Sequence, residues 1–162
     1  MKKIIVILLL FIIIGILIRP PVNEGKVTSA YGVRLAFGNY FHWGTDIGLP
    51  IGEPVSCISW GTVTNSGFHE QKGNFIWVNH FPGFQSRYLH LDSINVSNGQ
   101  KVSPHTLIGT VGSTGISTGP HLHYEKRLFG VPLPPYLIGL PGKLLQKIGA
   151  HDFVDSFFKN IS

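Results

Sequence analysis

Turn-forming residues interrupt the chain every few positions between residues 27 and 125, and this spacing limits what the region can fold into. The sequence holds 20 glycines and 11 prolines but only 13% charged residues, a composition that favours turns and short strands. Short apolar segments lie between the turns, and helical periodicity is absent. We therefore predict an all-β domain. Its expected strands are residues 55–60, 61–65, 75–80, 86–90, 107–111 and 121–126.

An unbroken apolar run precedes this region, from residue 4 to residue 18, between Lys2-Lys3 and Arg19. It is apolar on every face, which favours an export signal over a buried core helix. As a helix it would be about 22 Å long, short of the roughly 30 Å hydrocarbon core. The flanking cations could compensate by snorkelling and by local thinning of the bilayer.

A cleaved signal peptide also fits the length of this run, but no small-x-small cleavage site follows it. We therefore predict a retained single-pass membrane anchor. The lysines before the run would keep the N-terminus in the cytoplasm and place the domain outside, on the periplasmic or cell-wall side. If the segment is cleaved, the domain is secreted.

The chain thus divides into three expected parts: an anchor or signal segment (residues 1–21), one modest domain (22–130) and a tail (131–162). The tail begins with a Pro-rich extended stretch, and residues 143–161 have the pattern of a short amphipathic helix. Packing onto the domain is the expected role of this helix, and membrane contact is the alternative.

Charge and cysteine content exclude some functions. The formal net charge is +5, but the Lys and Arg residues are scattered and form no run, so nucleic-acid binding is unsupported. Cys57 is the only cysteine, which rules out an intramolecular disulfide. We predict that Cys57 is a buried structural thiol and not a nucleophile.

Eight histidines in a chain of 162 residues point to chemistry, and the first group of interest is His42 with Asp46. Their spacing of four would suit a helix, but Gly44 and Thr45 argue against one. We expect His42 to end a loop and Asp46 to begin a strand, with both side chains converging on one point. Imidazole nitrogen and carboxylate oxygen are both good zinc ligands.

The second group is His121-Leu122-His123. On a strand, residues two apart share a face, so both imidazoles would point the same way while Leu122 enters the core. Metal binding or acid–base chemistry explains such a pair better than structure alone does. Glu125 falls on the same face and could accept a hydrogen bond from one of the imidazoles.

The third group is His90 within a predicted strand, where we expect Tyr88 and His90 to share one face and Leu89 to lie on the other. The remaining histidines lack comparable neighbours and are interpreted as structural or surface residues: His69, His80, His105 and His151. The residues alone therefore predict two or three histidines and a carboxylate around a hydrolytic zinc ion, with an open position for water.

These groups together resemble the signatures of the lysostaphin and LytM-type zinc peptidases, the M23 family. The resemblance rests on His42-x-x-x-Asp46, on Tyr88-Leu-His90-Leu and on the segment 112–125, Gly-Ser-Thr-Gly-Ile-Ser-Thr-Gly-Pro-His-Leu-His-Tyr-Glu. It extends to the segments 28–34, 99–102 and 107–109, and so covers about residues 27 to 125.

The resemblance implies a compact antiparallel β-sheet fold with a narrow groove over one Zn²⁺ ion. It implies that His42, Asp46 and His123 hold the zinc, and that His90 and His121 are the catalytic pair. These two histidines would share proton transfer and oxyanion stabilisation, and the sequence leaves open which does which.

The implied substrate is the peptide part of bacterial peptidoglycan, either a cross-bridge or a stem peptide, and a regulatory protein partner is compatible with this. Two other readings are a zinc-containing wall-binding or activator module that cleaves nothing, and a structural metal domain of an envelope complex. Neither role needs His90 and His121 beside the metal, so the sequence favours the enzyme.

Overall fold

The computed structural model describes residues 20–34, 40–80 and 83–135. Within these ranges, no helix has the length and apolar character needed to span a membrane. The apolar run 4–18 and the expected tail helix 143–161 lie outside the described residues, so both remain predictions.

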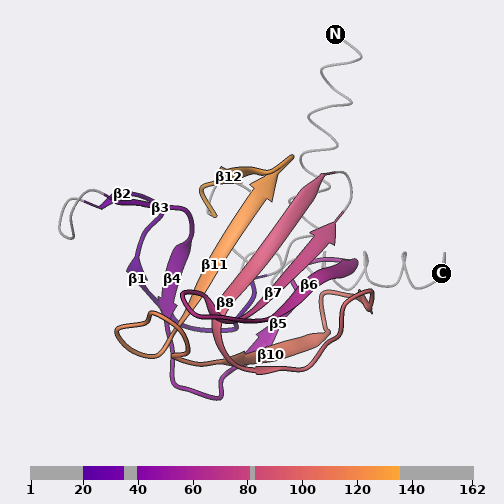
Figure 1. The fold of residues 1–162 in the computed structure, drawn as a ribbon, viewed down its shortest axis with the longest axis horizontal. Helices are drawn as coiled ribbons and strands as arrows, with labels where there is room; N and C mark the ends of the chain where they lie inside the picture. The colour runs from indigo at the N-terminus through magenta and orange to yellow at the C-terminus, as the bar shows by residue number, and fades with distance from the viewer. Residues whose placement is uncertain (1–19, 35–39, 81–82, 136–162) are drawn as a thin grey trace, which may run out of the picture.

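An antiparallel sheet dominates the described structure, with the strand order β1-β4-β11-β8-β7-β6-β9 (Figure 1). β10 joins it through β5 and β8, and β12 pairs with β11. A separate hairpin is formed by β2 and β3. The strands are β1 Lys26–Ser29, β2 Gly32–Arg34, β3 Tyr40–His42, β4 Thr45–Gly48, β5 Pro54–Ser56, β6 Gly61–His69, β7 Gly73–His80, β8 Phe84–Ile94, β9 Lys101–Val102, β10 Leu107–Val111, β11 His121–Leu128 and β12 Val131–Leu133.

The all-β prediction is confirmed, and the six expected strands correspond to β5, β6, β7, β8, β10 and β11. β10 has the predicted bounds, and most of the others are longer than predicted. β5 is shorter, because the chain leaves the strand after Ser56 and the Ile58 amide donates instead to the Tyr88 phenol oxygen, at 3.2 Å. The strands that pattern analysis did not place are short, two to four residues each.

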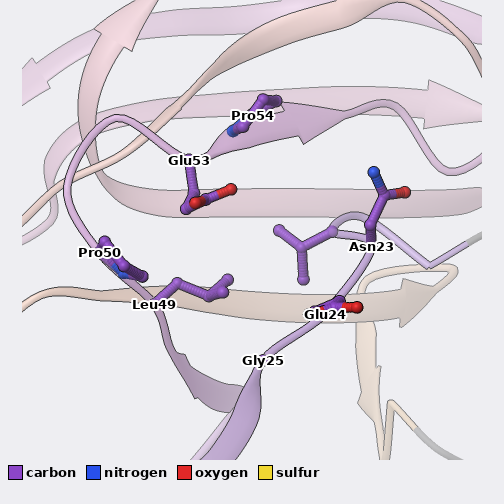
Figure 2. Close-up of a pocket in the computed structure, with 8 residues that line it drawn as sticks. Asn23, Glu24, Gly25, Leu49, Pro50, Glu53 and Pro54 are labelled. Carbon is purple, nitrogen blue, oxygen red and sulfur yellow. The ribbon is translucent and has the colours of Figure 1, made fainter.

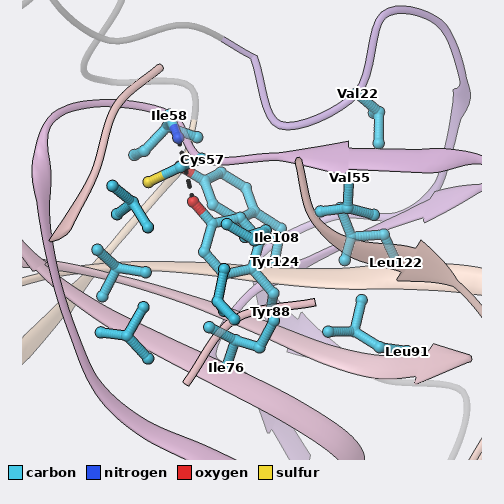
Figure 3. Packing of buried hydrophobic residues seen from close by; sticks show 14 of the residues in the cluster. Val22, Val55, Cys57, Ile58, Ile76, Tyr88, Leu91, Ile108, Leu122 and Tyr124 are labelled. Carbon is cyan, nitrogen blue, oxygen red and sulfur yellow. Dashed lines mark hydrogen bonds between the residues drawn. The ribbon is translucent and has the colours of Figure 1, made fainter. Parts of the chain in front are cut away.

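The core lies on one face of this sheet and is closed by β5 and β10 (Figure 3). Ile76, Tyr88 and Leu122 are fully buried there, so the prediction that Leu122 enters the core is confirmed. Cys57 is also fully buried, and its thiol donates to the Ser59 carbonyl at 3.0 Å. Burial raises the pKa of this thiol to about 11, so it stays protonated and inert.

A β-bulge in β8 determines which side chains face away from the core. Tyr88 pairs with Ile76 and Leu91 pairs with Asn74, so two residues of β8 lie opposite one residue of β7. His90 sits in the bulge with a φ of 62°. Because a bulge breaks the alternation of faces, the expectation that Tyr88 and His90 share a face is wrong. Tyr88 lies in the core, whereas the His90 ring lies 4.8 Å from that of His121, between ring centroids.

Candidate metal centre and active site

The three predicted metal ligands come from three strands that meet on the face opposite the core. His42 ends β3, Asp46 lies in β4 and His123 lies in β11, directly opposite Asp46 in the ladder. The expectation that His42 and Asp46 converge without forming a helix is therefore confirmed. The expectation that His42 ends a loop is wrong, because residues 40–42 pair with β2 as a strand. Gly44 joins β3 to β4, and a Cβ atom there would lie 2.6 Å from Nε2 of His123. Only glycine allows this turn to approach β11 so closely.

The ligand atoms form a small triangle. Nε2 of His42 lies 3.1 Å from Oδ1 of Asp46 and 3.1 Å from Nδ1 of His123, and the third side of the triangle is 2.8 Å. Two ligands of a four-coordinate zinc ion lie about 3.3 Å apart, given metal–ligand distances near 2.0–2.2 Å. Two imidazoles and one carboxylate at this spacing thus fit a zinc-type cation and leave one coordination position free.

Each of these ligands is oriented by a second partner. Nδ1 of His42 donates to the Ala30 carbonyl at 2.8 Å, which leaves the Nε2 lone pair for a metal. Nε2 of His123 donates to Oε1 of Glu125 at 3.4 Å, which leaves Nδ1. The acceptor role predicted for Glu125 therefore matches the geometry, and such partners fix the tautomer and the direction of a ligating imidazole.

Asp46 has a hydrogen-bond partner, Arg34, that the pattern of metal ligands in the sequence did not predict. Nη2 of Arg34 donates to Oδ2 of Asp46 at 2.6 Å, which leaves Oδ1 directed at the two imidazoles. The only sequence signal for Arg34 was its place in the 28–34 segment of the family resemblance. Burial acts to raise the pKa of Asp46, but the adjacent His123 and His42 side chains outweigh it and lower this pKa. Asp46 is therefore an ionised carboxylate, as a metal ligand must be.

His90 and His121 lie beside the triangle without belonging to it. Nε2 of His121 is 3.8 Å from Oδ1 of Asp46, and the His90 ring centroid is 5.9 Å from that of His123. The structure thus brings all five predicted site residues together. Burial is the main cause that lowers the pKa of His90, so this imidazole is neutral near pH 7.

One loop, residues 112–120, orients both of these histidines. Nδ1 of His90 donates to the Thr114 carbonyl at 2.8 Å, and Nδ1 of His121 donates to the Gly119 carbonyl at 2.7 Å. Each Nε2 is therefore the ring nitrogen whose lone pair can accept a proton. Gly115 shapes the loop with a φ of 73°, and a Cβ atom there would clash with the backbone nitrogen of Gly73.

The histidines interpreted as structural or surface residues lie elsewhere. His80 is buried, donates from Nδ1 to the Trp60 carbonyl at 2.7 Å and has the Ser86 hydroxyl 2.8 Å from Nε2. His69 and His105 are exposed, and His151 is outside the described residues. The interpretation holds for the three that the structure describes.

One cavity of the described residues lies away from these histidines and from Asp46. It has a volume of about 550 Å³ and is formed where residues 22–25 meet the connection between β4 and β5 (Figure 2). Apolar side chains and the carboxylates of Glu24 and Glu53 line it. None of the five predicted site residues does, so the chemistry belongs to the histidine face and not to this cavity.

Comparison with known proteins agrees with this geometry. Residues 40–135 match the model of peptidase family M23, and this range includes all five predicted site residues. A peptidoglycan DD-endopeptidase of Vibrio cholerae, ShyC, is 38% identical over 128 residues, which are 76% of this chain and 30% of the relative. The chain thus spans less than a third of that relative's length.

Solved structures show the same fold. A zinc-containing peptidase from Vibrio cholerae aligns with a TM-score of 0.66 and 35% identity, over 70% of this chain and 37% of that one. The catalytic domain of lysostaphin from Staphylococcus simulans aligns with a TM-score of 0.65 and 31% identity, over 76% of this chain and 94% of that domain. The chain belongs to peptidase family M23.

Proposed function

We propose that this chain is a zinc-dependent endopeptidase that hydrolyses peptide bonds of bacterial peptidoglycan, in a cross-bridge or a stem peptide. Family membership supports the peptidase activity, and the similarity to a peptidoglycan DD-endopeptidase supports the substrate class. The similarity to a zinc-containing peptidase and the donor set of His42, Asp46 and His123 support zinc as the metal.

A zinc ion held by these three residues would supply Lewis acidity, which polarises a carbonyl group and acidifies water. His90 and His121 would carry out the proton transfers. The lone pair on Nε2 of either ring can accept a proton from the attacking water, and the resulting imidazolium can return it to the leaving amine. The other ring, in its imidazolium form, can donate a hydrogen bond from Nε2–H to the developing oxyanion.

The observation that carries this proposal is the orientation of two histidines that do not bind the metal. Both Nδ1 atoms donate to carbonyls of the 112–120 loop. Nε2 of His121 lies 3.8 Å from Oδ1 of Asp46, and the His90 ring centroid lies 5.9 Å from that of His123. A module that only binds a metal, or only binds the wall, gains nothing from two such bases. Their arrangement favours catalysis over the non-catalytic alternative.

Digestion of purified peptidoglycan tests the function directly. The zinc-loaded chain should release peptide fragments whose masses identify the bond that is cut. A His121→Ala variant, prepared in parallel and checked for bound zinc, controls for contaminating hydrolases. Unchanged peptidoglycan after incubation with the zinc-loaded wild-type chain would refute the proposed activity.

We further propose that residues 4–18 anchor the chain in the membrane with the peptidase domain outside the cytoplasm. The cationic flanks and the missing cleavage site support this arrangement. A substrate in the cell wall is compatible with it.

A further inference from the structure

A row of charged and aromatic side chains crosses the sheet next to the metal ligands. Trp77 of β7 lies opposite Arg87 of β8, and Arg87 lies opposite Glu125 of β11. The neighbouring row runs from Leu89 through His123 to Asp46. Rows on one face are two residues apart along the strands, or about 7 Å. The Arg87 row is thus on the face of the metal site and one row away from it.

The contacts within this row hold Arg87 in place. Its guanidinium carbon lies 4.0 Å from the centroid of the Trp77 ring, a stacked cation–π geometry. Its Nε donates to Oε1 of Gln85 at 2.6 Å. Its Nη1 is 3.7 Å from Oε2 of Glu125, which is too long for a direct hydrogen bond.

Glu125 is occupied by other groups. Its Oε2 accepts a hydrogen bond from Nε of Arg127 at 2.8 Å, and its Oε1 accepts from His123 at 3.4 Å. Two guanidinium groups therefore share one carboxylate, and that carboxylate also orients a metal ligand. Burial and the nearby charge of Arg127 lower the pKa of Arg87, as expected for a cation that is incompletely neutralised.

This positive charge is accessible to a ligand. The side chains of Arg87 and Arg127 are each 19% exposed. A guanidinium presents a planar fork of donors that matches a carboxylate, and the unused donors of Arg87 are held in a fixed plane by the Trp77 stack. A peptide substrate offers one common anion of this shape, the free carboxylate of a C-terminus or of an acidic side chain.

We propose that Arg87, with Arg127 beside it, binds a free carboxylate of the substrate peptide within two residues of the bond that is cleaved. The spacing sets that limit, because an extended chain advances about 3.3–3.6 Å per residue and the Arg87 row lies about 7 Å from the metal row. The inference rests on the proposed peptidase function and specifies which peptides the site selects.

The competing explanation is that Arg87 only supports Glu125 and the sheet. A supporting role would lower cleavage of every peptide equally, whereas a carboxylate site would change the preference between charged and neutral peptides. The experiment therefore compares two forms of one substrate. Cross-linked peptides released from peptidoglycan are used as free acids and after carbodiimide-mediated conversion of their carboxylates to carboxamides.

The wild-type chain should cleave the free acid with a kcat/KM at least about tenfold above that of the amidated form. A ratio of about ten corresponds to the free energy that one charge-assisted hydrogen bond typically contributes. Arg87→Gln should lose most of this preference, mainly through a higher KM for the free acid, and Arg87→Lys should retain part of it. Lys101→Gln removes an exposed positive charge from β9 and should keep the wild-type preference.

Equal cleavage of the two forms by the wild-type chain, or an unchanged preference in Arg87→Gln, would overturn the carboxylate site and leave the peptidase function standing. If the wild-type chain cleaves neither form, the proposed function fails. Calorimetric titration with the same two peptides would then still decide the inference, since equal Kd values for the free acid and the amide would refute it.

Discussion

Replacing Gly44 by alanine should weaken metal binding by moving His123. A Cβ atom at position 44 would lie 2.6 Å from Nε2 of His123 and 2.6 Å from the Tyr124 carbonyl oxygen, whereas ordinary contacts begin near 3.4 Å. Either the turn or the imidazole must therefore move by about 0.8 Å. Zinc sites tolerate deviations of only about 0.2 Å in ligand distance. We expect the zinc Kd to rise at least about tenfold. This is the lower end of the loss in metal affinity that follows when the groups that orient a ligand are changed.

Competition with a chromophoric chelator measures this change. Gly67→Ala is the matched control, because a Cβ atom at position 67 in β6 would meet nothing within 4 Å. That variant should bind zinc as the wild-type chain does. Wild-type zinc affinity in Gly44→Ala, with folding confirmed by circular dichroism, would show that the close approach of this turn does not position His123.

Four further outcomes are expected. His123→Ala should lose zinc and activity together, and stoichiometric zinc in this variant by elemental analysis would refute the ligand assignment. His90→Ala and His121→Ala should keep zinc but lose at least about 10²-fold in kcat, because each removes one acid–base group and no ligand; wild-type rates of peptidoglycan digestion would contradict this. Full-length protein from cells should fractionate with membranes and retain residues 4–18, and a mature N-terminus just after this run would instead identify a cleaved signal. Burial lowers the pKa of His80 from 6.5 to about 4, so the unfolded chain takes up a proton first as the pH falls. The free energy of unfolding should therefore decrease by about 3 kcal/mol between pH 6.5 and 4, and His80→Gln should flatten this dependence in urea titrations.

The features that sequence reasoning found are those with a short repeat or a distinctive residue type. His121 and His123 are two apart on one strand, so the strand period alone places both on one face and Leu122 in the core. His42 and Asp46 are chemically conspicuous in a segment that cannot be helical. For these four histidine and aspartate positions, both the local geometry and the side-chain chemistry predict a place in the site.

Other features depend on contacts between distant segments and leave no local pattern. The bulge at His90 reverses the expected face of that residue, and it is visible only in the pairing of β8 with β7. Arg34 reaches Asp46 from the separate β2–β3 hairpin, and Arg87 stacks on Trp77 of the adjacent strand. A single sequence gives residue types and periods but not the register between strands, which decides these contacts.

Two different sets of contacts orient the five site residues. The metal ligands are fixed by Arg34, by Glu125 and by the Ala30 carbonyl, whereas His90 and His121 are fixed by carbonyls of the 112–120 loop. A displacement of that loop would therefore release both proposed proton-transfer groups, His90 and His121, and leave the ligand triangle in place. Under the proposed roles, metal content alone does not report on catalysis, because the proposed ligands and the proposed proton-transfer groups are positioned by different parts of the chain.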